Sequence, residues 1–182
     1  MHEEDLAEVT LAVREMYKGK IVQLQECDVR LPNGRSSVRE VVRHPGAVAI
    51  LAEPAANELV LVTQFRYAPG EALLELPAGK LEPRESAIDC AVRELAEETG
   101  YFAEQVRHIF EFYTSPGFAD ERISLYYATG LSSGETNFDD DEFVLMRSYH
   151  REELMEKLNN GSIRDAKTII GIQWWLQNGT KR

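Results

Sequence analysis

The most informative part of this chain is the stretch GKLEPRESAIDCAVRELAEETG, residues 79–100. Ser86 is a favourable N-cap residue, and Asp89 stands three positions later, as in a capping box. Gly100 suits the left-handed position that follows many helices. The spacing i, i+3, i+4, i+7 of a buried helical stripe is met by four apolar residues, Ile88, Ala91, Val92 and Leu95. The stretch therefore predicts a helix over residues 86–99.

The acidic residues of this helix are placed by its geometry. Relative to the centre of the apolar stripe, Glu98 falls roughly 70° away and Glu94 roughly 110° away, whereas Glu97 points to the opposite side. Like charges at i, i+4 destabilise a helix by roughly 0.2–0.5 kcal/mol, and partial burial worsens the repulsion unless a cation lies between them. Magnesium is usually held by a few carboxylates and substrate phosphates. Arg93 can balance one carboxylate, either Glu97 or Glu85. From these residues alone, a solvated acidic helix face is the alternative interpretation.

The remainder of the chain reads as many strands with helices between them. Residues 1–20 predict a loosely held arm or short strand, and residues 21–43 predict a hairpin that turns at Pro32-Asn33-Gly34. Further extended segments are predicted at 47–51, 59–65, 73–76, 108–113, 122–128 and 143–147, and further helices at 152–158 and 166–176. The segments 47–51 and 59–65 are expected to pair as neighbours. This order indicates an α+β protein or an α/β/α sandwich.

Composition narrows the functional classes. The 182 residues carry a formal net charge of −11, so the basic surface that a nucleic-acid binder or an anionic membrane requires is not expected. The two cysteines, Cys27 and Cys90, have no metal-ligand spacing and are expected to be buried apolar residues. The start lacks a signal-peptide apolar core, and no apolar run approaches the length of a membrane helix, which favours a cytoplasmic location.

The spacing of the informative stretch matches a family signature. The stretch resembles the box of the Nudix hydrolases. Gly79 is followed after five residues by Glu85, and after seven more by Arg93-Glu94-Leu95-Ala96-Glu97-Glu98-Thr99-Gly100. Tyr101 replaces the usual aliphatic residue. Leu76–Glu82, the segment Ser115-Pro116-Gly117-Phe118 and the tail 163–168 resemble the ADP-ribose pyrophosphatase branch. The likeness covers about residues 15–176 of the chain.

The resemblance implies a particular architecture. It is a Nudix-type α/β/α sandwich with mixed sheets and an N-terminal strand arm. Residues 1–43 would form the arm, and residues 44–182 would form the Nudix hydrolase domain. Relatives of this branch are commonly dimers that exchange N-terminal strands, so the resemblance implies a homodimer whose arm takes part in dimerisation.

The resemblance also implies a metal centre. Two or three Mg²⁺ or Mn²⁺ ions would be held by the carbonyl oxygen of Ala78 and by the carboxylates of Glu94, Glu97 and Glu98. Arg93 and Glu85 would orient the loop and the helix. The general base would come from the acidic stretch Asp139-Asp140-Asp141-Glu142, with Glu142 as the first choice. The catalytic residues are therefore expected to be Glu97, Glu142 and Arg93, while a solvated turn is the alternative for residues 139–142.

Substrate contacts are implied in three places. Arg66 resembles a phosphate-contacting arginine, Arg39 and Glu40 resemble a pair that holds the adenine end, and the third place is the segment Pro116, Gly117 and Phe118. A surface arginine at a strand end, charges at a strand edge, and an aromatic residue that packs its own loop are the respective alternatives.

The implied activity is metal-dependent hydrolysis of the pyrophosphate bond of ADP-ribose, and of related ADP-sugars, to AMP and a sugar phosphate. The partner is thus a small nucleoside diphosphate sugar. Alternatives are a Nudix pyrophosphatase for another compound, such as GDP-mannose, NADH or an oxidised nucleoside triphosphate, and a non-catalytic module that senses ADP-ribose. Such sensing modules usually lose carboxylates of the box, so the presence of Glu94, Glu97 and Glu98 favours an enzyme.

Overall fold

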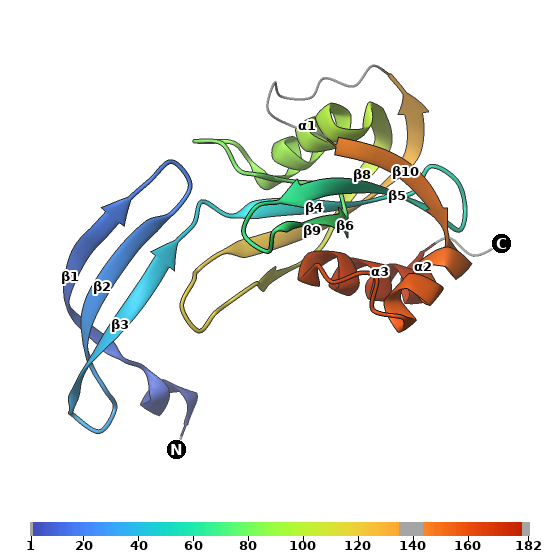
Figure 1. The fold of residues 1–182 in the computed structure, drawn as a ribbon. Helices are drawn as coiled ribbons and strands as arrows, with labels where there is room; N and C mark the ends of the chain where they lie inside the picture. Colours follow the sequence, from blue (N-terminus) through green and yellow to red (C-terminus); the bar gives the residue numbers. More distant parts are fainter. Residues whose placement is uncertain (1, 135–143, 180–182) are drawn as a thin grey trace. The chain divides into compact units, whose positions relative to one another are not determined.

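The protein is described by a computed structural model that covers residues 2–134 and 144–179 (Figure 1). Its contacts divide the chain into two compact units. Unit 1 comprises Met1–Gly46 and Tyr113–Arg122, and unit 2 comprises Ala47–Phe112 and Ile123–Arg182. The segment 113–122, which contains the predicted substrate loop, therefore groups with the N-terminal strands.

Unit 1 is built on an antiparallel three-stranded sheet in the order β1-β2-β3. The short 3-10 helix η1 (Glu3–Leu6) precedes β1 (Val9–Lys18), β2 (Gln23–Arg30) and β3 (Ser36–Arg43). The predicted hairpin is confirmed, because β2 and β3 pair from Gln23↔Arg43 to Arg30↔Ser36. Gly34 has a φ of 82° in the connecting turn, a conformation in which glycine costs least. Residues 9–18 form a full strand rather than a loose arm.

Unit 2 contains a mixed sheet whose main path runs β10-β5-β4-β9-β8. Its strands are β4 (Ala47–Ala52), β5 (Glu58–Arg66), β6 (Glu71–Glu75), β7 (Ala78–Lys80), β8 (Tyr101–Tyr113), β9 (Arg122–Ser133) and β10 (Val144–His150). β4 pairs parallel with β9 and antiparallel with β5 and β7, and β6 pairs antiparallel with β5. The predicted pairing of the segments 47–51 and 59–65 is thereby confirmed.

Helices cover both faces of this sheet (Figure 1). α1 (Ala87–Thr99) lies on one face, and α2 (Arg151–Asn159) and α3 (Ala166–Asn178) lie on the other. The alternation of side chains along β4 explains the two layers. Val48, Ile50 and Ala52 pack in the cluster that contains α1 residues, whereas Ala49 and Leu51 pack in the cluster that contains α3 residues. The predicted α/β/α sandwich with a mixed sheet is confirmed.

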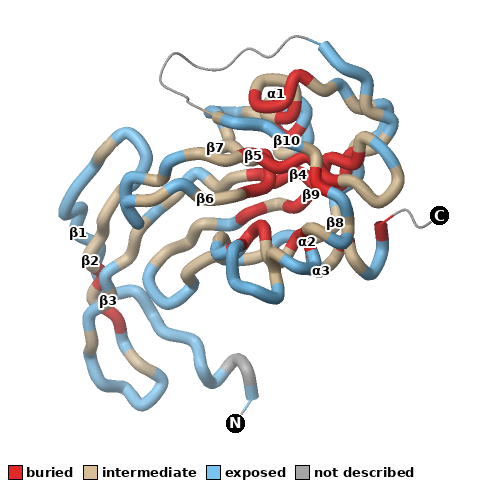
Figure 2. Tube along the Cα trace, turned by 45° about the vertical axis from the view of Figure 1, so that its right-hand side comes forward, coloured by how far each residue is buried: buried red, intermediate tan, exposed pale blue. Residues whose placement is uncertain are grey.

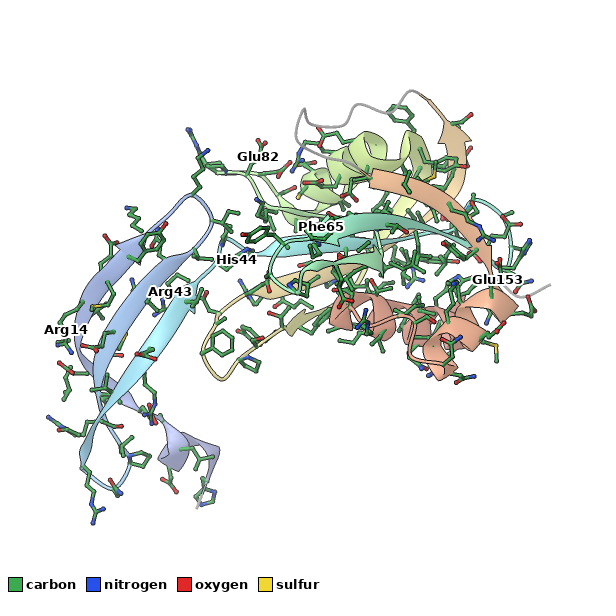
Figure 3. All side chains as sticks on the ribbon, viewed as in Figure 1. Arg14, Arg43, His44, Phe65, Glu82 and Glu153 are labelled. Carbon is green, nitrogen blue, oxygen red and sulfur yellow. The ribbon has the colours of Figure 1, made fainter. Side chains whose placement is uncertain are left out.

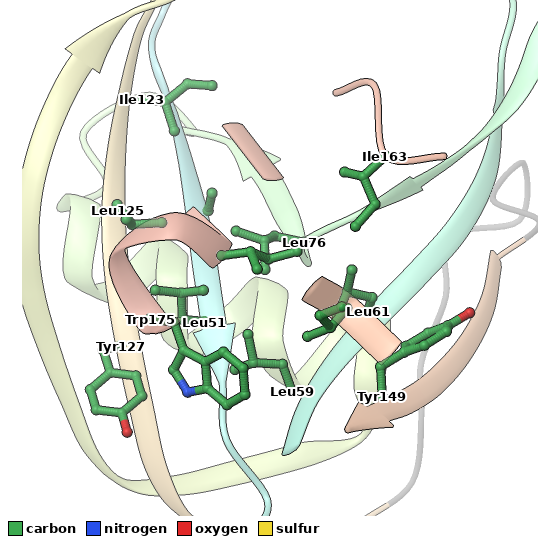
Figure 4. Close-up of a cluster of buried hydrophobic side chains, with 13 residues drawn as sticks. Leu51, Leu59, Leu61, Leu76, Ile123, Leu125, Tyr127, Tyr149, Ile163 and Trp175 are labelled. Carbon is green, nitrogen blue, oxygen red and sulfur yellow. The ribbon is translucent and has the colours of Figure 1, made fainter. Parts of the chain in front are cut away.

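The larger apolar core lies between the sheet and α2 and α3. Trp175, Leu51, Leu59 and Leu61 are completely buried within it (Figure 4). Buried residues concentrate in β4, β5, β9 and the helix faces turned toward them (Figure 2). At roughly 1.5–3 kcal/mol for each fully buried large apolar side chain, this core supplies a rigid platform for the loops at the edges of the sheet.

Strand lengths differ from the sequence-based expectation after α1. β8 begins at Tyr101, directly after the helix, rather than at residue 108, and β9 extends to Ser133 rather than to residue 128. The polar residues Glu104, Gln105 and Arg107 weakened the apolar alternation that identifies a strand. Residues 78–80, read from the sequence as a loop, form the short strand β7 on β4.

Candidate active site

The ends of α1 fix the position of the box residues. Ser86 accepts a hydrogen bond from the amide of Asp89 at 3.2 Å, as expected of the N-cap. Gly100 has a φ of 66° and donates its amide to the carbonyl of Ala96 at 2.9 Å. Because both ends are capped, the helix has one register, and Glu94 and Glu98 project one turn apart.

The buried face of α1 is turned relative to the predicted stripe. Ile88 and Val92 are 45% and 47% exposed, so their predicted burial is wrong. Ala91 and Leu95 are buried as predicted, and Cys90, Glu98 and Thr99 complete the buried face. Small Cys90 and Ala91 let the helix approach the sheet closely, and the face shifts by roughly 45° toward Glu98. Glu98, predicted at the border of the face, lies in its middle at 2% exposure.

A hydrogen bond joins Glu98 to the segment before the box. Oε2 of Glu98 accepts the amide of Ala78 at 2.9 Å, and the amide of Ile50 donates to the carbonyl of Pro77 at 2.9 Å. The bonds of an antiparallel ladder alternate, so the register Ala49↔Ala78 is a non-hydrogen-bonded pair. The amide and carbonyl of Ala78 therefore point away from β4. This orientation suits the predicted role of the Ala78 carbonyl as a ligand beside Glu98.

Arg93 organises the acidic residues around it. Its Nε and Nη2 donate to Glu85 at 2.8 and 2.9 Å, and Nη1 donates to Glu94 at 2.8 Å and to Glu97 at 2.9 Å. The hydrogen bonds from Arg93 lower the pKa of Glu85 to about 2. The same bonds, that to Glu85 first, raise the pKa of Arg93 above its usual value. The sequence predicted that Arg93 balances one carboxylate, whereas it bonds three.

The donor set is oxygen-rich and anionic, which is the chemistry that Mg²⁺ prefers. Within residues 2–134 and 144–179, no three acidic, histidine or cysteine side chains converge as a ready metal cage. Arg93 instead bridges Glu94 and Glu97. Magnesium is commonly bound by one or two protein carboxylates together with substrate phosphates and water, so Glu94, Glu98 and the Ala78 carbonyl fit such an ion without a complete protein cage.

Arg66 lies in the same unit as the box. Its guanidinium makes a two-bond pair with Glu75, which contributes most to raising the pKa of Arg66, and the charge of Glu98 adds to the effect. Glu142 and the other acids of 139–142 lie outside the described residues. The next strand, β10, begins at Val144 opposite Gln64, two residues before Arg66 on β5.

The other predicted substrate residues all belong to unit 1. Arg39 lies on β3 and pairs with Glu8 through two hydrogen bonds of 3.0 and 2.5 Å, and its neighbour Glu40 is exposed. The amide of Val42 donates to the carbonyl of Phe118 at 2.8 Å, so the exposed loop Pro116–Phe118 is attached to β3. Unit 1 thus brings Arg39, Glu40 and the loop onto or beside one strand.

Asp120 reinforces this attachment and was not predicted from the sequence. Its carboxylate accepts the amide of His44 at 2.9 Å and Nη1 of Arg43 at 3.0 Å. Arg43 and His44 adjoin at the end of β3 (Figure 3). His44 is therefore a structural residue of this junction. The only signal in the sequence was an acidic residue soon after a Ser-Pro-Gly turn, which is too common to identify a partner.

Comparisons with known proteins identify the family. The family model of the NUDIX domain matches residues 42–169, which include the box and the segment 113–122. The chain belongs to the Nudix family.

Two relatives and one solved structure illustrate the likeness. An ADP-ribose pyrophosphatase of Bacillus subtilis (strain 168) is 43% identical, with 94% of each chain covered. A methanol dehydrogenase activator of Bacillus methanolicus is 46% identical, with 92% of this chain and 91% of that protein covered. A crystal structure titled ADP compounds hydrolase superimposes with a TM-score of 0.81 at 20% identity, covering 94% of this chain and 96% of that one, and supports the fold. None of the described helices has the length and apolarity needed to span a membrane.

Proposed function

We propose that this protein hydrolyses the pyrophosphate bond of ADP-ribose, and of related ADP-sugars, to AMP and ribose 5-phosphate or the corresponding sugar phosphate. The observation that carries the proposal is the buried Glu98, joined to the Ala78 segment and one helical turn from Glu94. The relative named ADP-ribose pyrophosphatase, similar over nearly the whole chain, supports this substrate class.

Nudix hydrolases generally need a divalent metal, and two or three Mg²⁺ or Mn²⁺ ions would be held here by Glu94, Glu98, the Ala78 carbonyl and Glu97. Bound ions would neutralise the diphosphate and lower the pKa of a bound water. Arg93 holds Glu94 and Glu97 together through its two Nη1 hydrogen bonds. Glu85 fixes the other edge of that guanidinium.

The reaction is substitution at phosphorus. The oxygen of water forms a bond to one phosphorus atom, the bridging P–O bond breaks, and the bridging oxygen leaves on the other phosphate. A carboxylate at residues 139–142, Glu142 in the first instance, takes the proton from the water. Arg66 would bind the diphosphate, a task that suits its planar, permanently charged guanidinium.

The adenine and ribose ends of the substrate are assigned to the residues that the family resemblance implies. Arg39 and Glu40 would hold the adenine end, from the same or a neighbouring subunit, and the loop Pro116–Phe118 would contact the ribose. Phe118 is 60% exposed, so its ring is accessible to a ligand.

A homodimer completes the proposal. β1 is an edge strand that exposes its apolar side chains, including Val9, Leu11, Val13 and Tyr17, each at least 46% exposed. Exposed edges of this kind invite pairing with a second chain. Sedimentation equilibrium of the full chain tests this: a monomer at micromolar concentration would contradict it.

The decisive experiment identifies products. The purified chain is incubated with Mg²⁺ and ADP-ribose, ADP-glucose, GDP-mannose, NADH and an oxidised nucleoside triphosphate in separate reactions, and the products are identified by mass spectrometry. Water labelled with ¹⁸O reports which phosphorus is attacked. We expect AMP and ribose 5-phosphate from ADP-ribose, with the highest kcat/KM of the panel. A higher kcat/KM for another compound would contradict the proposed substrate and assign pyrophosphate hydrolysis of that compound.

A second candidate is activation of a dehydrogenase, which the 46% identical relative favours by its name. Adding the chain to a methanol dehydrogenase and measuring turnover tests it. An increase that persists in a hydrolysis-dead variant would assign a role separate from pyrophosphate cleavage.

A further inference from the structure

A cluster of ionic side chains lies in unit 2 at the end of β6, three residues before Ala78, the proposed backbone ligand. Glu75 is its centre and is only 1% exposed. Arg66 comes from the end of β5, and Lys167 and Thr168 come from the first turn of α3. A fully buried carboxylate costs several kcal/mol unless it is paired, so Glu75 in the apolar run Leu73-Leu74-Glu75-Leu76 depends on these cations.

Glu75 binds one particular edge of Arg66. Nε of Arg66 donates to Oε1 of Glu75 and Nη2 donates to Oε2, both at 2.8 Å. The guanidinium is a rigid planar fork, so these two bonds fix its plane and leave Nη1 outside the pair. The side chain of Arg66 is 41% exposed, whereas that of Glu75 is 1% exposed. Glu75 therefore holds the buried edge of Arg66 and directs the opposite edge toward the accessible side.

Lys167 supplies a second cation to the same carboxylate. Its Nζ pairs with Glu75 and lies 3.1 Å from Asp165, and its side chain is 9% exposed. Burial favours the neutral form of Glu75 most strongly, yet the hydrogen bonds and charges of Arg66 and Lys167 outweigh it and hold the pKa below its usual value. When the diphosphate of the substrate pairs with Arg66, the ammonium group of Lys167 still neutralises the buried carboxylate of Glu75.

The start of α3 also fixes the backbone that follows Glu75. The amide of Leu76 donates to Oγ1 of Thr168 at 2.8 Å. Thr168 is itself held by the N-cap Asp165, which accepts both its amide at 2.9 Å and its hydroxyl at 2.6 Å. The chain then continues to Ala78, whose amide is bound by Glu98. Side chain and backbone around Glu75 are thus held from α3, far away in sequence.

We propose that Glu75 and Lys167 are positioning residues for the reaction: Glu75 orients Arg66 toward the diphosphate, and Lys167 keeps Glu75 ionised and in place. The assignment rests on the proposed function, because Arg66 must bind a diphosphate for its orientation to matter. Neither residue touches the reacting atoms; both act through Arg66 and the segment that ends at Ala78.

Kinetics of single variants give the first test. Glu75→Gln and Lys167→Met should each lower kcat/KM for ADP-ribose by about 10- to 100-fold, because each removes a charged hydrogen-bonding partner. Lys167→Arg should recover most of the loss because it restores the charge. Arg164→Met is the matched control. It removes a cation from the same segment, but the ion pair of Arg164 with Glu71 is exposed. Activity of Arg164→Met should stay within about two-fold of wild type.

A double-mutant cycle separates positioning from general structural damage. If Glu75 acts through Arg66, Glu75→Gln should have little further effect on kcat/KM in an Arg66→Ala background. Removing both buried charges, in Glu75→Gln with Lys167→Met, should restore the melting temperature lost in Lys167→Met alone. Equal fold-losses of kcat/KM for Glu75→Gln in both backgrounds would overturn the proposal.

An NMR measurement is independent of turnover and hence of the proposed substrate. The ¹⁵Nε–¹Hε signal of Arg66 is identified as the one that disappears in Arg66→Lys. Its proton should exchange slowly with solvent in the wild type. It should exchange at least about ten-fold faster in Glu75→Gln, because the lost charge weakens the bond. A slow signal without hydrolysis of ADP-ribose would contradict the proposed function alone. A wild-type signal that exchanges as fast as exposed arginines would contradict the positioning of Arg66.

Discussion

A β-carbon on residue 79 would lie 1.8 Å from the carboxyl carbon of Glu94. The backbone of Gly79 is outside the left-handed region, so the requirement for glycine at this position is one of space and not of φ. β7 and α1 approach each other at this point, and the carboxylate of Glu94 fills the gap that the missing side chain leaves. The glycine that begins the box is thus explained by the glutamate fifteen positions later.

Gly79→Ala should therefore damage the metal centre more than the fold. The methyl group would displace the flexible end of Glu94, which can move without unfolding the helix but cannot then serve as a ligand. We expect kcat to fall at least about ten-fold, with a higher Mg²⁺ requirement. Isothermal titration with Mn²⁺ and a thermal melt would separate the two effects. A large drop in melting temperature with unchanged metal affinity would contradict this explanation.

Glu98→Gln should be close to inactive and still folded. The amide oxygen of glutamine can accept the amide of Ala78 as Glu98 does, while its lost charge weakens metal binding. Because loss of an outer-shell partner typically costs about 10- to 100-fold, loss of a ligand should lower kcat at least about 100-fold. Circular dichroism provides the control for folding. Full activity with Mg²⁺ would remove Glu98 from the site.

The ion pair between Glu85 and Arg93 should stabilise the protein only above acidic pH. The pKa of Glu85 falls from 4.5 to about 2 in the folded protein, chiefly through its hydrogen bonds from Arg93. The unfolded chain binds this proton first as pH falls, so the stabilisation is present above pH 4.5 and is lost progressively toward pH 2. Urea unfolding in EDTA should show Glu85→Gln less stable than wild type at pH 7, with the gap shrinking in acid. A pH-independent gap would refute the linkage.

Gly171→Ala tests the packing of α3 against Leu76, two residues before Ala78. A methyl group there would lie 2.6 Å from Cδ1 of Leu76 and 3.3 Å from Cδ2 of Leu51. Alanine gains about 1 kcal/mol of helix propensity, but overpacking a core typically costs about 1–3 kcal/mol. We expect a net loss of about 1 kcal/mol and a melting temperature lower by about 2–4 °C. Leu76→Val in the same background should recover part of the loss if Leu76 is the obstacle.

Glu142→Gln should slow turnover with little change in metal affinity, since the proposed base removes a proton and holds no ion. The acidic limb of the pH–rate profile should be lost with it. Glu142 lies outside the described residues, so Asp140→Asn and Asp141→Asn are made in parallel. A silent Glu142→Gln beside a dead Asp140→Asn or Asp141→Asn would move the base within this stretch.

The sequence determined the box, its helix and the sandwich around it, because these depend on short-range spacing. Ser86 and Gly100 cap α1 as their residue types predict, and the break at Asn57-Glu58 between the apolar runs 47–51 and 59–65 predicted neighbouring strands. The placement of Glu94 and Glu98 one turn apart on one flank follows from helical geometry, whereas their role as metal ligands comes from the family resemblance. Metal binding and the substrate contacts of Arg39, Glu40, Arg66 and Phe118 stay predictions.

Only the tertiary structure decided which face of α1 is buried and which distant residues support the site. Helical periodicity predicted that Ile88, Ala91, Val92 and Leu95 are buried, and packing against the sheet buried Ala91 and Leu95 with Cys90 but left Ile88 and Val92 exposed. Lys167 lies 92 residues after Glu75, and the partner of an ionic group at such a separation has no sequence period. Long-range pairing is fixed by where the strands and α3 come together in space, which local spacing does not encode.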